Sequence, residues 1–101
     1  MKPTIDVEVR PTSDGWVADV ALGEPPGRHR YEVRVARPAW ESLTGGEAPV
    51  EALVEASFRF LLEREPPDAI LQRFDLLVIE RYFPEYREAM RAWMARPASD
   101  G

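Results

Sequence analysis

The stretch PVEALVEASFRFLLERE, residues 49–65, decides the fold class, because the spacing of apolar residues changes there to the helical period. Its apolar stripe falls at positions i, i+3, i+4, i+7, i+8 and i+11. The stripe consists of Val50, Leu53, Val54, Ser57, Phe58 and Leu61. Pro66 and Pro67 end the pattern, since proline cannot continue the backbone hydrogen bonds of a helix. We therefore predict one long amphipathic helix over residues 49–65.

Three segments before this helix alternate apolar and polar residues with the period of two that is typical of half-buried strands. They are Thr4–Arg10, Trp16–Leu22 and His29–Arg37. Turn-forming residues at 11–15 and 23–27 separate them. Short connections between three such strands predict an antiparallel meander with one apolar face.

The two connections also set the expected geometry of this sheet. Gly15 in the first connection is free to take a positive φ, which glycine adopts at no steric cost. Across the second connection, matching the apolar faces places Val20 opposite Val33 and Asp19 opposite Arg34. A cross-strand ion pair between Asp19 and Arg34 is therefore expected.

Shorter helical pieces are predicted on both sides of the long helix. They are one helical turn at 38–43, then Pro67–Phe74, Leu76–Phe83 and Glu85–Arg96. Asp75 is a residue type that often caps the start of a helix, so it is expected to cap the predicted helix Leu76–Phe83. The predicted fold class is α+β: a three-stranded antiparallel meander with one long helix packed on its apolar face, followed by short C-terminal helices. Residues 1–96 are expected to form a single domain, and residues 97–101 a frayed tail.

Composition narrows the classes of function. The chain has 101 residues, a formal net charge of −5 and no cysteine. A chain of this length can bury a core without a disulfide or a metal, and the lack of cysteine excludes thiolate catalysis and cysteine-ligated zinc. The negative charge disfavours non-specific binding to nucleic acid or anionic lipid. Without a signal-like apolar region or an apolar run of about 18 residues, we expect a cytoplasmic location and no membrane contact.

No catalytic, cofactor-binding or metal-binding residue is predicted. His29 is the only histidine, and no serine or cysteine is spaced to be activated by it. No metal-binding spacing such as HxxxH includes it. The remaining acid–base candidates are carboxylates, which are explained by helix ends. These carboxylates are Glu63, Glu65, Asp68, Glu80 and Glu85. We therefore expect no enzymatic activity and no cofactor.

The local cationic cluster is an alternative site for anions or nucleic acid. It consists of Arg28, Arg30, Arg34 and Arg37. Tyr31 lies on the opposite face of the strand from Arg30 and Arg34, so aromatic and cationic side chains do not share one surface as base-stacking platforms require. A solvated face of mixed charge is the simpler interpretation.

The segment RFDLLVIERYFPEY, residues 73–86, is the densest run of large apolar side chains. On a helical wheel, Leu76, Ile79 and Phe83 face the core, whereas Leu77 and Val78 fall on the far side. A helix that is apolar nearly all round must be covered on two sides. The second cover is either the last helix or another chain. The candidate interface residues are Leu77, Val78, Arg81, Tyr82 and Tyr86.

The run SFRFLLEREPPDAILQRFDLLVIERYFPEY, residues 57–86, resembles the C-terminal part of a group of small uncharacterised bacterial proteins. The shared features are a strand-rich front, an FLLERE-P helix end and an IL-x-x-FDL-x-x-I-x-x-YFPEY ending. The order of three strands and a helix is also loosely similar to HicB-type antitoxins of toxin–antitoxin pairs. The first resemblance implies a small bacterial domain and the second a fold, and neither assigns a functional residue.

These observations favour a non-enzymatic protein that binds itself, as a possible homodimer, or a partner protein through its C-terminal helices. The alternative is a nucleic-acid-associated regulator or antitoxin-like protein that uses the arginine-rich third strand. A small carboxylate-dependent enzyme is the third hypothesis.

Overall fold

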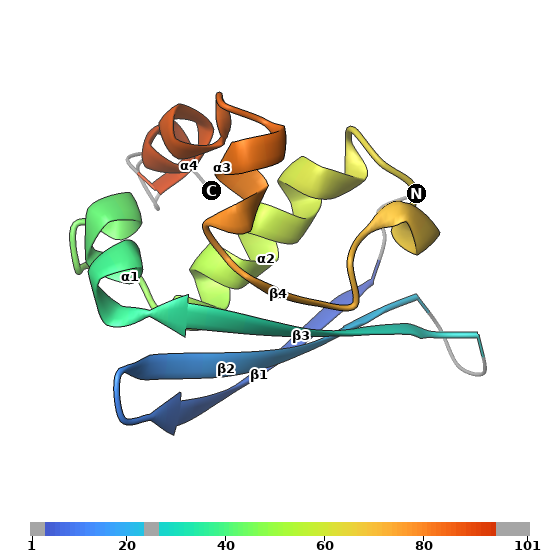
Figure 1. The fold of residues 1–101 in the computed structure, drawn as a ribbon, viewed down its shortest axis with the longest axis horizontal. Coiled ribbons are helices and arrows are strands. Elements are labelled where there is room, and N and C mark those ends of the chain that lie inside the picture. The colour runs from blue at the N-terminus through green and yellow to red at the C-terminus, as the bar shows by residue number, and fades with distance from the viewer. Residues whose placement is uncertain (1–3, 24–26, 95–101) are drawn as a thin grey trace, which may run out of the picture.

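A computed structural model describes residues 4–23 and 27–94 of the chain. The described chain forms a four-stranded mixed sheet and four α-helices, which confirms the α+β class. Figure 1 shows the helices gathered on one side of the sheet. The elements in chain order are β1 (Ile5–Thr12), β2 (Gly15–Leu22), β3 (His29–Ala36), α1 (Arg37–Thr44), α2 (Val50–Leu62), the 3-10 helix η1 (Pro67–Ala69), β4 (Arg73–Asp75), α3 (Val78–Tyr82) and α4 (Tyr86–Met94).

The sheet has one strand more than the sequence predicted. Strands β1, β2 and β3 form the expected antiparallel meander, and β4 then pairs in parallel with β3. The Glu32 N–H donates to the Gln72 carbonyl at 2.7 Å, and the Leu76 N–H donates to the Arg34 carbonyl at 2.9 Å. The predicted helix 67–74 is therefore wrong beyond η1. A helix of two turns is marginal on its own, whereas an extended chain satisfies the open edge of β3.

The register between β2 and β3 also differs from the prediction. Val20 lies opposite Tyr31, and Asp19 lies opposite Glu32. Asp19 instead accepts a hydrogen bond from Arg10 of β1 at 3.3 Å. Side chains alternate between faces with a period of two, so a shift of two residues preserves which face each side chain occupies. Matching the faces could therefore not choose between the two registers.

The core lies between the sheet and α2, as predicted from the two apolar patterns. Val33 of β3 and both Leu53 and Phe58 of α2 are completely buried. The Tyr31 and Phe58 rings pack with their centroids 5.1 Å apart. The Phe58 ring also packs near the Phe74 ring of β4, with the centroids 6.2 Å apart, so α2 contributes to the region where the candidate site is built.

Gly15 is required for a reason other than the one predicted. The positive-φ glycines of the described chain are Gly23, Gly45 and Gly46. At Gly15, a Cβ atom would lie 2.1 Å from the Val35 carbonyl oxygen. Glycine therefore permits the close approach of β2 to the end of β3 rather than a left-handed turn.

The helix ends differ from the predicted bounds by a few residues. The helix α1 covers eight residues rather than one turn, and Gly45 closes it by donating its N–H to the Glu41 carbonyl at 2.8 Å. The helix α2 stops at Leu62, before the two prolines. The last two residues of the predicted helix 85–96 and the predicted tail at 97–101 lie outside the described residues.

Candidate functional site

The predicted helix 76–83 is shorter in the structure and begins later. Leu76 is buried, and because its N–H donates to the Arg34 carbonyl, it continues the β4 pairing instead of opening a helix. The helix α3 follows Leu77, whose side chain makes no capping hydrogen bond. Asp75 lies in β4 and therefore does not have the predicted capping role. The first two residues of the expected helix, Leu76 and Leu77, thus form a turn between β4 and α3 instead.

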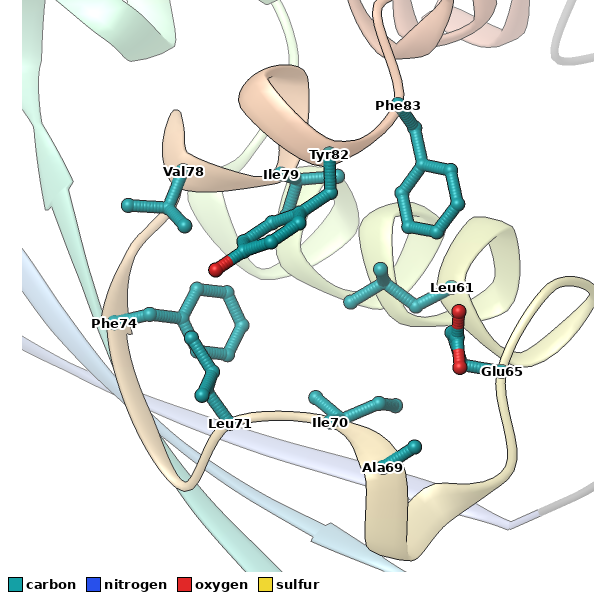
Figure 2. A pocket seen from close by; sticks show the side chains of 10 residues that line it. All are labelled: Leu61, Glu65, Ala69, Ile70, Leu71, Phe74, Val78, Ile79, Tyr82 and Phe83. Atoms are coloured by element: carbon teal, nitrogen blue, oxygen red, sulfur yellow. The ribbon is translucent and has the colours of Figure 1, made fainter.

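This change creates an apolar pocket between α2, η1, β4 and α3, which we call the α3 pocket (Figure 2). Its volume is about 240 Å³. Leu71 and Tyr82 at this pocket are 50% and 66% exposed, and with Trp93 they are the exposed large hydrophobic residues of the described chain. The lining residues are Leu61, Glu65, Ala69, Ile70, Leu71, Phe74, Val78, Ile79, Tyr82 and Phe83.

Both walls of the α3 pocket are fixed by polar contacts. On the η1 side, the Tyr31 hydroxyl donates to the Pro67 carbonyl at 2.6 Å, which ties η1 to β3. Burial, and then the nearby charge of Asp68, raises the pKa of this tyrosine, so its hydroxyl stays protonated.

On the α2 side, the guanidinium of Arg64 joins the end of α2 to the segment after α3. It lies 3.6 Å from the centre of the Phe60 ring and donates to the Phe60 carbonyl and to the carboxylate of Glu85. The hydrogen bond that the Glu85 carboxylate accepts from the backbone N–H of Glu85 lowers the pKa of this carboxylate. The contact with Arg64 lowers the same pKa further. The pocket is therefore part of the folded framework.

Glu65 is the charged residue among the lining side chains. In the part of the chain that the structure describes, its carboxylate has no hydrogen-bond or ion-pair partner. Glu63, two residues earlier, pairs with Arg64 at 3.4 Å. In Figure 2 the Glu65 side chain lies across the pocket from Phe74 and Leu71. The pocket thus combines apolar walls with a carboxylate at one side that has no partner among the described residues.

The structure divides the predicted interface residues into three groups. Val78 and Tyr82 line the α3 pocket. Leu77 and Arg81, together with Val78, line a second cavity of about 330 Å³ between α3 and the start of α1. Tyr86 is completely buried, so it is a core residue and not a contact for a partner.

Sequence reasoning missed most of the α3 pocket. Leu61 and Phe83 were placed in the core, and Glu65 was explained by the end of a helix. Ile70 and Leu71 fell within the predicted helix 67–74, whereas the extended chain after η1 buries Ile70 and exposes Leu71. The two consecutive prolines at the start of η1, Pro66 and Pro67, were the available signal that the chain changes direction there.

The four arginines of the alternative site are not brought together as one free cluster. Arg28 is bonded to the Asp6 carboxylate and to the Gly23 carbonyl. Arg37 lies 4.8 Å from the centre of the Trp16 ring. Arg30 and Arg34 are exposed on the sheet face away from the helices. Two of the four are thus engaged in intramolecular contacts.

A row of three carboxylates crosses the same outer face. Glu8 of β1 lies opposite Asp19 of β2, which lies opposite Glu32 of β3. This row separates the cations at Arg30 from those at Arg10 and Arg34. The outer face is therefore a surface of mixed charge without a continuous positive stripe.

His29 and Glu80, two further candidates, do not meet at a common site. His29 is exposed at the start of β3. Glu80 forms an ion pair with Arg87 at 3.0 Å. Within residues 4–23 and 27–94, no group of three or more His, Cys, Asp or Glu side chains is arranged to hold a metal ion.

Comparison with protein-family models, curated proteins and solved structures gives no match for this chain. The resemblances in residues 57–86 and to HicB-type antitoxins therefore stay predictions. None of the described helices is long and apolar enough to span a membrane.

Proposed function

We propose that this chain is a non-enzymatic protein-interaction domain, which binds a second copy of itself or another protein through the surface formed by β4 and α3. The observation that carries the proposal is the α3 pocket with Leu71 and Tyr82 exposed beside it. Large apolar side chains grouped around a concave surface are typical of binding sites, whereas single exposed ones need no explanation.

The two edges of the sheet support this location. Strand β1 forms one edge, and it carries charged side chains and Pro11, which has no N–H for a further strand. Strand β4 forms the other edge and borders the α3 pocket. The edge at β1 has the features that prevent edge-to-edge pairing, and the edge at β4 has an apolar surface beside it.

The test compares wild type with the double variant Leu71→Ser/Tyr82→Ser. Both residues are at least half exposed, so the variant is expected to fold and melt like wild type. Trp93→Ser is the matched control, because Trp93 is also a large exposed hydrophobic residue but does not line the pocket. Sedimentation velocity measures self-association, and co-purification from the source cells measures capture of a partner.

The proposal predicts a dimer or a captured partner with wild type and with Trp93→Ser, and its loss with the double variant. Equal mass and equal capture for all three proteins would contradict it.

The alternative function, a nucleic-acid-associated regulator or antitoxin-like protein, has less support. Arg30 and Arg34 are exposed on the outer face, but the carboxylate row beside them repels a phosphate backbone. We expect weak or absent binding of DNA and RNA at physiological salt. Tight binding that is lost in Arg30→Glu/Arg34→Glu would favour this alternative instead.

A further inference from the structure

We propose that the occupant of the α3 pocket is an extended peptide segment of a partner protein, which pairs with the outer edge of β4. It inserts one apolar side chain into the pocket and carries a Lys or Arg two residues away that faces Glu65. This inference rests on the proposed function and names the partner's chemistry.

The hydrogen-bonding pattern of β4 leaves backbone groups free for a further strand. The Gln72 carbonyl, just before β4, accepts a hydrogen bond from β3, and the Leu76 N–H, just after β4, donates one to β3. Successive residues of a strand direct their backbone groups to opposite sides. The N–H and carbonyl groups of Arg73 and Asp75 therefore point away from β3, toward the position that a fifth strand would occupy. A peptide can thus be held there by main-chain hydrogen bonds, as in strand addition to a sheet edge.

The side chains of β4 show on which face the side chains of an added strand would lie. Phe74 lies opposite Val33, a completely buried residue, so it projects to the helix side, and it lines the α3 pocket. Arg73 and Asp75 project to the outer face. Every second side chain of an added strand therefore lies on the helix side, next to Phe74 and Leu71 (Figure 2).

The size of the α3 pocket indicates how much of a partner it can hold. A volume of about 240 Å³ is below the roughly 300–1,000 Å³ of typical small-molecule sites. Its walls are apolar apart from Glu65. These properties fit a single aliphatic or aromatic side chain anchored from a longer chain.

The negative charge at the α3 pocket indicates the charge of the partner. Glu65 lines the pocket without an ion-pair partner among the described residues, and Asp68 lies in the adjacent η1. A carboxylate beside an apolar anchor site selects a cation in the partner and disfavours an anion. Because side chains on the helix side recur every two residues, the nearest position for the cation on that side is two residues from the anchor. The expected motif is an apolar residue, any residue, then Lys or Arg, in either direction along the chain.

The probe is a phage-displayed library of random decapeptides, selected on the immobilised full-length protein. The proposal predicts enrichment of the apolar–x–Lys/Arg spacing. A synthetic peptide from the enriched set is then titrated by fluorescence anisotropy. We expect Leu71→Ser/Tyr82→Ser to weaken binding by about tenfold or more and Trp93→Ser to leave it unchanged.

Two further measurements separate the charge from the strand pairing. Glu65→Gln is expected to weaken binding by about two- to fivefold at low salt, whereas the control Glu63→Gln leaves it unchanged. N-methylation of the peptide at the residues that face β4 is expected to weaken binding by about tenfold, and methylation of the alternate residues to have little effect.

The outcomes distinguish this inference from the proposed function. Binding that depends on Leu71 and Tyr82 but not on Glu65 or on the methylation pattern would overturn the extended cationic peptide and leave the interaction surface in place. Failure to enrich any peptide, with a dimer that the double variant abolishes, would identify a second copy as the occupant and overturn the inference. Peptides that bind the double variant as well as wild type would overturn both.

Discussion

Tyr86 is the largest completely buried side chain of the described residues, and it links α4 to α2. Its hydroxyl lies 2.7 Å from Ser57 Oγ, which in turn is 2.8 Å from the Leu53 carbonyl. Because serine has one proton and the Leu53 carbonyl accepts it, Tyr86 donates to Ser57. This chain of hydrogen bonds satisfies every polar side-chain atom buried between the two helices.

Tyr86→Phe should remove one buried hydrogen bond and lower the free energy of unfolding by about 1 kcal/mol. Burial raises the pKa of this tyrosine above its usual 10.0. Above pH 10.0 the unfolded chain then releases a proton that the folded chain retains, so wild-type stability falls as the pH rises. Urea unfolding at neutral and alkaline pH measures both effects. The variant should lose less stability between the two pH values, and an unchanged pH dependence would contradict the buried placement.

Gly15→Ala tests the close approach of β2 to β3. Its Cβ atom would meet the Val35 carbonyl oxygen at 2.1 Å, so the backbone must shift, at a cost of about 1–3 kcal/mol. Gly27→Ala is the control, since nothing lies within 4 Å of a Cβ atom there. Thermal unfolding should separate the two variants clearly, and equal melting temperatures would mean that the strands are further apart than described.

Among the elements, those with their own apolar period were predictable from the sequence. The strands β1 to β3 alternate with a period of two, and α2 has a long helical stripe, so each pattern identifies its element without knowledge of the rest. Strand β4 has three residues, and what holds it is a parallel pairing with β3, some 40 residues earlier. Because β4 is held by a strand that lies far away in the sequence, its own residues carry no pattern that predicts a strand. The prediction therefore began the following helix at Leu76, whereas α3 begins at Val78.

The packing of α2 on the sheet predicts that Phe58→Asp unfolds the protein. Phe58 is completely buried against the Tyr31 ring. An unpaired charge there costs several kcal/mol, which is comparable to a total stability of about 5–15 kcal/mol. Val33→Asp, on the facing strand, should have the same effect. His29→Ala, at an exposed position, should be nearly silent. Circular dichroism spectra show whether each variant is folded. A folded Phe58→Asp or Val33→Asp variant would show that the core lies elsewhere.

Amide hydrogen exchange tests β4 directly. The N–H groups of Glu32 and Leu76 donate within the sheet, so they should exchange slowly. Those of Arg73 and Asp75 point away from β3 and should exchange about tenfold faster or more. A continuous helix through this segment would instead protect consecutive amides. Addition of a peptide that binds the edge should slow the amides of Arg73 and Asp75 alone.

For the molecule as a whole, the sequence located the residues of the α3 pocket only in part. It placed Val78 and Tyr82 on a contact surface, because α3 has more apolar side chains than one covered face requires. It could not place Leu61, Glu65 and Leu71 there, since these lie on other segments that meet α3 once β4 has joined the sheet. The candidate site is therefore a product of the tertiary fold.

If the surface around the α3 pocket contacts another polypeptide, as we propose, a crosslinker placed there should capture that polypeptide. The most direct test of this proposal is photo-crosslinking in the source cells, with benzoylphenylalanine placed at position 71 or 82, or at the control positions 17 and 34 on the outer sheet face. We expect one discrete crosslinked product from positions 71 and 82, and none from positions 17 and 34. Products from the sheet face, with none from positions 71 and 82, would contradict the proposal.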